Sequence, residues 1–405
     1  MEVRFPLLMD AATGTELQKH GMPAGVCSEK WTLEHPEVIV NIQKGYVAAG
    51  SQVLYTPTFG ANRVKLEANH IFNQVEEYNM RLAALSKEAA GDKALVAGDM
   101  SPTGQFLYPL GNKTFEEFYD IYHEQAAALE KAGVDLFVIE TMMTVAEARA
   151  ALLAVRDVSD KPAFVSFTCD ENGRTLTGCD IAAVLQIMQG MGCDAFGMNC
   201  SVGPDQMVPQ LKRLKEIARV PLIAKANAGV PELVNGKTVY NCPPEEYASH
   251  VEAMAEAGVM IYGGCCGTAA EHIAAIKEKL AQVEIGRPAP ADNGLLPAAT
   301  EKELFFLDPG VGIGKVLECG DDLEDNLEEE LESDDEVVAI AIRSEDELDN
   351  FADCQYMISK PLCLVCDDAV LLEQALRLYQ GRALYEGTLS EEKLQPLQKK
   401  YGLIY

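Results

Sequence analysis

Between Phe5 and about residue 285, short runs of β-branched and aromatic residues alternate with longer amphipathic stretches that are rich in Ala, Glu, Lys and Leu. The short runs have the character of strands and the longer stretches that of helices, so this part of the chain is predicted to consist of repeated βα units. The eight predicted strands are Phe5–Asp10, Gln52–Thr56, Ala94–Gly98, Leu136–Glu140, Ala163–Thr168, Ala195–Asn199, Leu222–Ala226 and Met260–Gly264.

Each predicted strand is followed by a helical pattern, of which Phe115–Lys131 and Val145–Val155 are good examples. Thr144 precedes the second of these, and Glu147 three residues later completes the spacing of a capping box. Eight βα units in about 280 residues predict an α/β fold with a closed (β/α)8 TIM barrel. An open doubly wound sheet is the alternative, but the turn after the first strand, residues 10–15, lacks the GxGxxG pattern typical of that fold.

The pattern changes after the barrel, which we expect to occupy residues 1–285. Residues 286–300 are rich in Pro and Ala and are predicted to form a linker, and residues 301–405 a small α/β module. Residues 321–353 carry Asp or Glu at most polar positions, which predicts a solvated surface or a mobile acidic segment. The strands predicted in the module are Val337–Ile342, Gln355–Ile358, Leu362–Val365 and Ala383–Leu384, and its helices are Ala369–Tyr379 and Glu391–Lys400.

The net charge of the chain limits the classes of molecule that it is expected to bind. The 405-residue chain has 33 basic and 63 acidic side chains, a formal charge of −30, which disfavours binding to nucleic acid or to anionic membrane surfaces. Its apolar stretches are much shorter than the roughly 20 residues of a membrane span, and no basic-then-apolar signal pattern begins the chain. We therefore expect a soluble, cytoplasmic protein whose partners are neutral, zwitterionic or cationic.

Twelve cysteines in a chain of this length do not suggest a disulfide scaffold, a pattern that belongs to short secreted domains. Only six histidines are present, without an HExxH motif or a cluster. If the protein binds a metal, thiolates are the expected ligands, and they favour zinc or another soft ion.

The segment Tyr262–Thr268 (YGGCCGT) carries the strongest chemical signal and lies at the end of the eighth predicted strand. Adjacent side chains of a strand point to opposite faces, so Cys265 and Cys266 can reach one ion only if the backbone leaves strand geometry between them. Gly263, Gly264 and Gly267 could accept positive φ there. A buried, inert cysteine pair is the structural alternative.

The position of this pair in the predicted barrel favours a functional site, because barrel enzymes place their active sites at the carboxyl ends of the strands. Cys200 follows the sixth predicted strand, and only the seventh separates it from the eighth. Three thiolates could therefore meet at the barrel mouth. Three protein ligands around zinc leave the fourth position open, as in catalytic zinc sites.

A zinc ion with three thiolates has a net charge of about −1, which makes it a poor activator of water. It can still bind an incoming thiol and favour its thiolate form, so the expected chemistry is alkylation of sulfur, with Cys200, Cys265 and Cys266 as the catalytic residues. Asp10 and Glu140 end the first and fourth predicted strands and could hold the ammonium group of an amino-acid substrate; helix capping is an equally plausible role for them.

Several motifs resemble the homocysteine S-methyltransferase family, and most of all the homocysteine-binding module of cobalamin-dependent methionine synthase. The similar segments, in family order over some 70% of the chain, are DAATGTE (10–16), TPTFGANR (56–63), GDMSPTGQFLYPLG (98–111), ETM (140–142), GRTLTG (173–178), NCSVGP (199–204), NAG (227–229) and GGCCGT (263–268). The resemblance implies a (β/α)8 barrel with Zn²⁺ on Cys200, Cys265 and Cys266, and homocysteine sulfur as fourth ligand. It also implies that Asp10 and Glu140 lie near the substrate amino group and Asn227 near the metal; Thr15 and Asn199, in the same motifs, are predicted as further substrate-binding residues.

Two features bear on the resemblance. The family pattern Asp-Gly-Ala is Asp10-Ala11-Ala12 here, which narrows the space beside the substrate. Residues 360–405 are faintly similar to part of a pterin-binding domain but far too short for a complete one, and none of the six histidines fits the DxHxxG cobalamin motif. We therefore expect a methylated corrinoid such as methylcobalamin to be supplied by a separate protein or from solution, with S-methylmethionine or betaine as alternative donors.

Other interpretations remain open. The chain could be a non-catalytic module that binds thiols or docks a corrinoid protein, and a barrel aldolase would need a Schiff-base lysine, for which Lys225 is the candidate. Cys363 and Cys366 form a CxxC pattern without a second pair or a nearby histidine, so we predict buried structural cysteines. Trp31, the single tryptophan, could cover the barrel mouth or simply pack.

Overall fold

The fold was analysed in a computed structural model, which describes residues 3–234, 237–290 and 293–405. The chain forms two compact units. The first comprises the residues up to Thr177 and Cys193–Pro290, and the second comprises Gly178–Gly192 and Ala291–Tyr405. None of the helices in the described ranges combines the length and apolar character needed to cross a bilayer.

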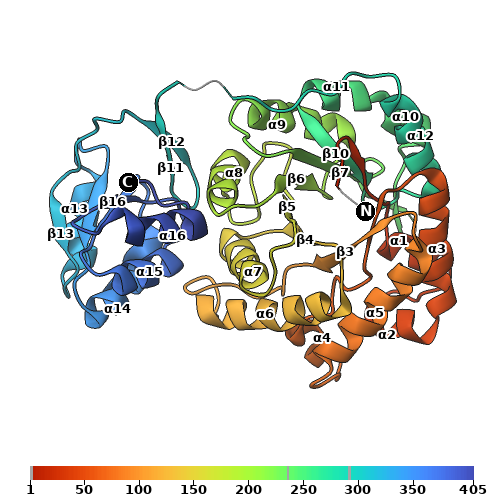
Figure 1. The fold of residues 1–405 in the computed structure, drawn as a ribbon, viewed down its shortest axis with the longest axis horizontal. Helices are drawn as coiled ribbons and strands as arrows, with labels where there is room; N and C mark the ends of the chain where they lie inside the picture. The colour runs from red at the N-terminus through yellow and green to blue at the C-terminus, as the bar shows by residue number, and fades with distance from the viewer. Residues whose placement is uncertain (1–2, 235–236, 291–292) are drawn as a thin grey trace. The chain divides into compact units, whose positions relative to one another are not determined.

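The first unit is built around eight parallel strands, surrounded by helices (Figure 1). The strands are β1 (Leu7–Leu8), β2 (Val53–Tyr55), β3 (Leu95–Met100), β4 (Leu136–Met142), β5 (Ala163–Phe167), β6 (Ala195–Asn199), β7 (Leu222–Ala226) and β10 (Val259–Gly264). They follow the order β1-β10-β7-β6-β5-β4-β3-β2. At the two ends of this order, the Gln52 amide donates a hydrogen bond to the Leu8 carbonyl (2.7 Å), so the barrel is nearly closed. The predicted barrel is confirmed and the open sheet is excluded.

Alternating strand residues fill the centre of this barrel. The central cluster contains such pairs as Leu7 in β1 and Met9 directly after it, and Leu136 and Val138 in β4, all at most 2% exposed. The intervening residues of β4, such as Phe137 and Ile139, are also fully buried. Both faces of a parallel strand are therefore covered, which explains why the strands appear in the sequence as continuous apolar runs.

The helices of the first unit follow the predicted rhythm. They are α1 (Gly14–Lys19), α2 (Ser28–Glu34), α3 (Pro36–Ala49), α4 (Arg63–Ala68), α5 (Val75–Ala90), α6 (Phe115–Ala132), α7 (Val145–Val158), α9 (Pro204–Lys215), α10 (Pro244–Ser249), α11 (Val251–Glu256) and α12 (Ala270–Leu280). A hairpin of β8 (Glu232–Val234) and β9 (Lys237–Val239) follows β7.

The capping box predicted at Thr144 is only half formed. The Thr144 hydroxyl accepts a hydrogen bond from the Glu147 amide (3.4 Å), but the Glu147 carboxylate accepts from the amide and hydroxyl of Thr103 (2.8 and 2.6 Å). Glu147 thus fixes the loop after β3. The complete box lies at α6, where Thr114 and Glu117 each bind the other's amide.

The second unit contains α8 (Ile181–Gly190), an antiparallel hairpin and a four-stranded parallel sheet with the order β13-β14-β15-β16. Its other elements are β11 (Leu296–Ala299), β12 (Leu304–Leu307), β13 (Val316–Glu318), α13 (Leu323–Leu331), β14 (Val338–Ala341), α14 (Glu345–Cys354), β15 (Leu362–Val365), α15 (Ala369–Leu378), β16 (Leu384–Glu386) and α16 (Glu391–Tyr401). Residues of the hairpin and of the parallel sheet share one core cluster. The predicted small α/β module is confirmed, while its boundaries and those of the linker stay a prediction.

One expectation for this unit was wrong, and another is decided between its two alternatives. Residues 355–358 form a short 3-10 helix (Gln355–Met357) instead of a strand. The acidic residues 321–353 contain α13 and α14 and form a solvated surface and not a mobile segment, because Leu323 and Leu327, and likewise Leu348 and Phe351, are spaced to bury one helical face. The opposite faces carry the exposed acidic side chains.

Candidate metal and thiol site

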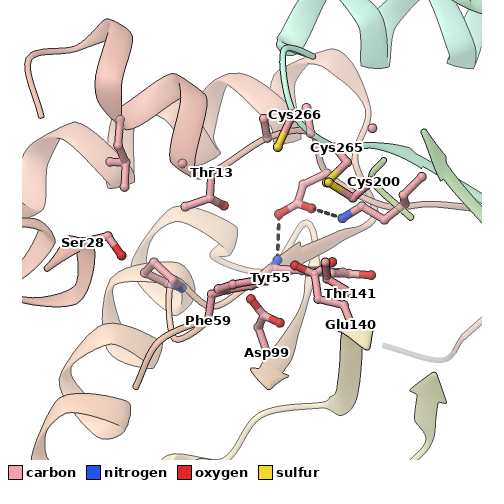
Figure 2. Close-up of a pocket in the computed structure, with 18 of the residues that line it drawn as sticks. Thr13, Ser28, Tyr55, Phe59, Asp99, Glu140, Thr141, Cys200, Cys265 and Cys266 are labelled. Atoms are coloured by element: carbon pink, nitrogen blue, oxygen red, sulfur yellow. Dashed lines mark hydrogen bonds and ion pairs between the residues drawn. The ribbon is translucent and has the colours of Figure 1, made fainter. Parts of the chain in front are cut away.

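Three cysteines from two strand ends meet at the mouth of the barrel. The Sγ atoms of Cys200, Cys265 and Cys266 all lie within 4.8 Å of one another, and each residue is half-buried (Figure 2). Cys200 follows β6 and the adjacent pair follows β10, with β7 between these strands. The sulfurs are therefore close enough to share one ion.

The backbone leaves strand geometry at both positions. β6 ends at Asn199, and Cys200 and Ser201 then adopt left-handed conformations, with φ of 63° and 57°. Such conformations are uncommon for residues other than Gly and concentrate at functional sites. Strand β10 ends at Gly264, so Cys265 and Cys266 lie in the following turn.

The neighbouring strand β7 fixes these turns. Its Lys225 carbonyl accepts a hydrogen bond from the Cys200 amide (3.1 Å), and its Ala226 carbonyl accepts one from the Cys265 amide (2.8 Å). The Cys265 carbonyl in turn accepts a hydrogen bond from the Thr268 hydroxyl (2.6 Å). Two cysteine-bearing strand ends are thus held by one strand between them.

The glycines of the motif have different roles from one another. Gly267 has a φ of +82°, and a Cβ there would lie 2.4 Å from the Tyr240 side chain. Gly263 and Gly264 do not adopt positive φ, contrary to the expectation. Gly264 is needed for space instead, since a Cβ would lie 2.3 Å from the Thr268 hydroxyl.

The three thiols differ in their pKa values. Hydrogen bonds from Cys200 and Cys265 lower the pKa of Cys266 to about 3, with a further contribution from Tyr240 and against the effect of burial. Hydrogen bonds to Cys200 and Cys266, together with burial, raise the pKa of Cys265 well above its usual range. Three sulfurs, one of which ionises readily, form a donor set that is consistent with zinc.

A cavity of about 230 Å³ adjoins the three sulfurs. Its walls are Asp10, Ala11, Ala12, Thr13, Gly14, Leu17, Ser28, Glu29, Thr32, Tyr55, Pro57, Phe59, Asp99, Glu140, Thr141, Cys200, Lys225, Gly264, Cys265 and Cys266. A small molecule in this space could therefore reach the sulfur cluster.

Asp10 and Lys225 form a buried ion pair in the cavity wall. The Lys225 Nζ donates to Asp10 Oδ1 (3.0 Å) and lies 3.4 Å from the centre of the Tyr55 ring, while the Tyr55 amide donates to Asp10 Oδ2 (2.8 Å). Burial lowers the pKa of Lys225, but Tyr55, Asp10 and Glu140 together raise it well above its usual range. A protonated ammonium is not a Schiff-base nucleophile, which argues against the aldolase interpretation.

Glu140 and Asn199 form a second polar pair. Asn199 is fully buried, and its Nδ2 donates to Glu140 Oε2 (3.2 Å) and to the Thr141 hydroxyl (2.6 Å). Its Oδ1 accepts from the Thr141 amide and the Ser166 hydroxyl (both 2.9 Å). Burial, with the Asp10 and Cys200 charges, raises the pKa of Glu140 to about 7 despite the opposite effect of Lys225. Asn199 therefore orients Glu140.

The remaining predicted residues lie around the site in different ways. Thr15 is not part of the cavity wall, and its hydroxyl accepts a hydrogen bond from the Gly267 amide (3.1 Å), which supports the cysteine turn. Asn227 directly follows β7 and is 1% exposed, and its Oδ1 has no hydrogen-bond partner among the described residues. Trp31 stacks on His35 at 4.2 Å between ring centres and does not line the cavity.

Sequence reasoning missed Asp99 and Tyr240, and it considered Lys225 only as an aldolase lysine. Asp99 lies at the carboxyl end of β3 and lines the cavity. Its position beside a predicted strand end was the available signal. Tyr240 had no such signal, because it lies in the long segment between β7 and α10.

Comparisons with known proteins agree with this arrangement. Residues 7–280 match the family described as Homocysteine S-methyltransferase. The methionine synthases of Mycobacterium leprae and Mycobacterium tuberculosis are each 30% identical to the chain, over 77% and 68% of its length. The chain spans only about a quarter of these relatives, 27% and 24% respectively.

Solved structures share the barrel fold. The oxidised form of the homocysteine methyltransferase MmuM from Escherichia coli has a TM-score of 0.59 at 24% identity, and its metallated form has a TM-score of 0.58 at 23% identity. Each covers 67% of this chain, and 95% and 96% respectively of the bacterial protein.

Proposed function

The chain belongs to the homocysteine S-methyltransferase family, and we propose that it is a zinc-dependent enzyme that methylates the sulfur of homocysteine to form methionine. The observation that carries this proposal is the convergence of three cysteine sulfurs within 4.8 Å beside a cavity. Family membership supports homocysteine as the substrate, and the names of the mycobacterial relatives support methionine as the product.

Cys200, Cys265 and Cys266 would hold the ion. When bound, zinc lowers the pKa of a nearby thiol and so supplies a sulfur nucleophile at neutral pH. The three protein thiolates leave one position of a tetrahedral site open for the substrate. We infer that Asn227, which directly follows the strand between the two cysteine-bearing strands, is the residue that would occupy this position when substrate is absent; its buried Oδ1 has no hydrogen-bond partner among the described residues, which supports this role.

The methyl transfer is a simple displacement at the methyl carbon. The thiol proton of homocysteine leaves to solvent, a sulfur lone pair forms the new bond to the methyl carbon, and the bond between that carbon and the donor breaks with its electrons on the donor. The protein contributes by fixing the sulfur against the cavity wall, where Asn199 orients Glu140 and Asp10 pairs with Lys225.

We propose that the methyl donor is a methylated corrinoid presented by a separate protein or from solution. A corrinoid is far larger than the cavity, so only its methyl group could approach the sulfur, from the barrel mouth. S-methylmethionine and betaine are smaller donors that the same site could accept.

Zinc analysis combined with turnover tests the proposal. The zinc-loaded chain is incubated with homocysteine and, in separate reactions, methylcobalamin, S-methylmethionine or betaine, and methionine is measured by mass spectrometry. We expect methionine from methylcobalamin and none from the Cys266→Ala variant. Methionine from another donor alone would contradict the corrinoid, and tight thiol binding without product from any donor would favour a non-catalytic thiol-binding module.

A further inference from the structure

Two aromatic rings belong to the described lining of the cavity, those of Tyr55 and Phe59 (Figure 2). The face of an aromatic ring attracts cations, and several such rings together commonly bind quaternary ammonium ligands. A methylsulfonium or trimethylammonium compound is a cation of this kind. The two rings are therefore the places in the wall where a cationic methyl donor would be stabilised.

An ammonium group of the protein already lies over the Tyr55 ring. The Lys225 Nζ is 3.4 Å from the ring centre and 3.0 Å from Asp10 Oδ1, and the side chains of this ion pair are only 4% and 1% exposed. Although burial lowers the pKa of Lys225, Tyr55 and the neighbouring carboxylates raise it well above its usual range. The ring thus has a permanent cation of its own.

The barrel leaves a path for this lysine. Lys225 of β7 lies opposite Gly263 in the register of β7 and β10, and Asp10 follows β1 on the other side of β10. A Cβ at Gly263 would lie 3.0 Å from the Lys225 Cγ. Because Gly263 has no side chain, Lys225 can cross β10 and reach Asp10 and the Tyr55 ring.

A second ammonium group lies over the other ring. The Lys65 Nζ is 4.6 Å from the centre of the Phe59 ring and donates a hydrogen bond to the Ser101 hydroxyl (3.1 Å). Burial lowers the pKa of Lys65, while three neighbouring carboxylates act in the opposite direction. Both rings of the described cavity wall therefore have a lysine of the same chain over one face.

A cationic donor would have to compete with these two lysines. To reach the face of Tyr55 that Lys225 covers, it would displace Lys225 and leave Asp10 charged and buried, which is strongly unfavourable. Sulfonium and betaine donors are small enough for the cavity, so its size does not exclude them. A methyl group bound to cobalt carries no onium charge and gains nothing from a free ring face.

We propose that Lys225 and Lys65 determine the class of methyl donor. By occupying the faces of Tyr55 and Phe59, they disfavour sulfonium and quaternary ammonium donors and leave a donor without an onium charge favoured. This inference rests on the proposed function and names the residues that distinguish between its alternative donors.

A matched pair of probes tests the inference without methyl transfer. Choline and 3,3-dimethylbutan-1-ol have the same shape and the same hydroxyl group, but only choline has a quaternary ammonium group. The ratio of their affinities therefore reports recognition of the positive charge, and the space left by a smaller side chain affects both probes alike. Dissociation constants are measured by titration calorimetry with the zinc-loaded chain and its variants.

We expect the unmodified protein to prefer choline by less than about threefold, and Lys225→Ala and Lys65→Ala each to raise this preference about tenfold, because a ring face becomes available. Lys225→Arg keeps a cation over the ring and should behave like the unmodified protein. Lys44→Ala, which removes an exposed lysine of α3, is the control. A tenfold preference for choline in the unmodified protein would overturn the inference, and so would an unchanged preference in both zinc-loaded alanine variants.

Methyl transfer gives an independent measurement. The rate of methionine formation from S-methylmethionine, relative to that from methylcobalamin, should rise about tenfold in Lys65→Ala. An unchanged ratio of rates in a variant that has gained choline binding would contradict the assignment of donor class.

Folding defects and failure of the proposed function can be distinguished from failure of this inference. If Lys225→Ala does not fold, Lys65→Ala decides, because Lys65 is not part of an ion pair among the described residues. If no donor yields methionine with the zinc-loaded protein, it is the proposed function that fails, while the choline ratios still decide whether the lysines keep cations from the rings.

Discussion

Both units of this protein contain cysteines beside parallel strands, but among the residues that the structure describes, only the set at the barrel mouth brings three sulfurs close enough to share a metal ion. Cys363 lies within β15 and is 1% exposed, packed in the core of the second unit. Cys366 follows the same strand, and its thiol donates to the Asp368 carbonyl (3.2 Å). At the barrel mouth, by contrast, Cys265 and Cys266 lie in a turn beside a cavity.

The comparison teaches that the backbone around a cysteine matters more than its spacing in the sequence. The CxxC pattern of the second unit is a common ligand spacing, yet burial raises the pKa of Cys363 to about 12. The adjacent pair is an unusual spacing, yet left-handed backbone at Cys200 and a turn after β10 direct three sulfurs together. Irregular backbone at strand ends creates the site.

Substitution of single cysteines should give the largest difference in effect between the two units. Cys266→Ala should abolish stoichiometric zinc binding and methyl transfer, because two thiolates cannot replace three ligands. Cys363→Ala should retain zinc and lower the free energy of unfolding by about 1 kcal/mol through lost packing. Metal analysis and urea unfolding measure both; full zinc in Cys266→Ala would contradict the assignment.

Ion pairs provide a second contrast. Lys225→Met should destabilise the protein by about 3–5 kcal/mol, because Asp10 would be left charged and buried. Arg343→Met in the second unit breaks an exposed pair with Glu318 and should cost less than about 1 kcal/mol.

Urea unfolding of both variants gives these values, and the double variant Asp10→Asn/Lys225→Met is the internal control. It should recover part of the loss caused by Lys225→Met, because no unpaired charge remains. Equal, small effects of Lys225→Met and Arg343→Met would show that the pair in the cavity is not buried from solvent as described.

Two glycines with positive φ sharpen the contrast further. Gly267 and Gly294 have φ of +82° and +72°, but only Gly267 is crowded, by Tyr240. Gly294→Ala should cost about 1 kcal/mol for the backbone alone, whereas Gly267→Ala should cost about 2–4 kcal/mol because overpacking is added. Unfolding free energies measure the difference, and Gly267→Ala should also weaken zinc binding.

Helix caps should show the smallest effects, and similar ones in both units. The side chains of Thr144 and Ser344 each accept a hydrogen bond from the amide three residues later, at 3.4 Å. Replacement of either by Ala should cost about 1 kcal/mol without loss of zinc. A much larger effect at Thr144 on zinc content would mean that α7 positions the metal site, which local capping does not predict.

Much of the architecture could be predicted from the sequence, because buried positions of a helix or strand are occupied by apolar residues at a regular spacing. The eight barrel strands were each predicted to within about two residues of their ends, and β1 is shorter than expected at both ends. The strand predicted at residues 355–358 was wrong, because Gln355–Met357 form a 3-10 helix. Helices α13 and α14 were not predicted, because acidic residues outnumber the few apolar residues of their buried faces.

The sequence by itself determined the barrel and the position of each cysteine at a strand end, since hydrophobic periodicity and chain order are local properties. Only the tertiary structure decided which polar groups pair. Lys225 reaches Asp10 across 215 residues, and Glu147 turns from its own helix to Thr103. The Oδ1 atom of Asp99 is left without a hydrogen-bond partner among the described residues. Such pairings depend on which strand ends lie next to one another in the nearly closed barrel, and no pattern along the chain gives the distance between two strand ends.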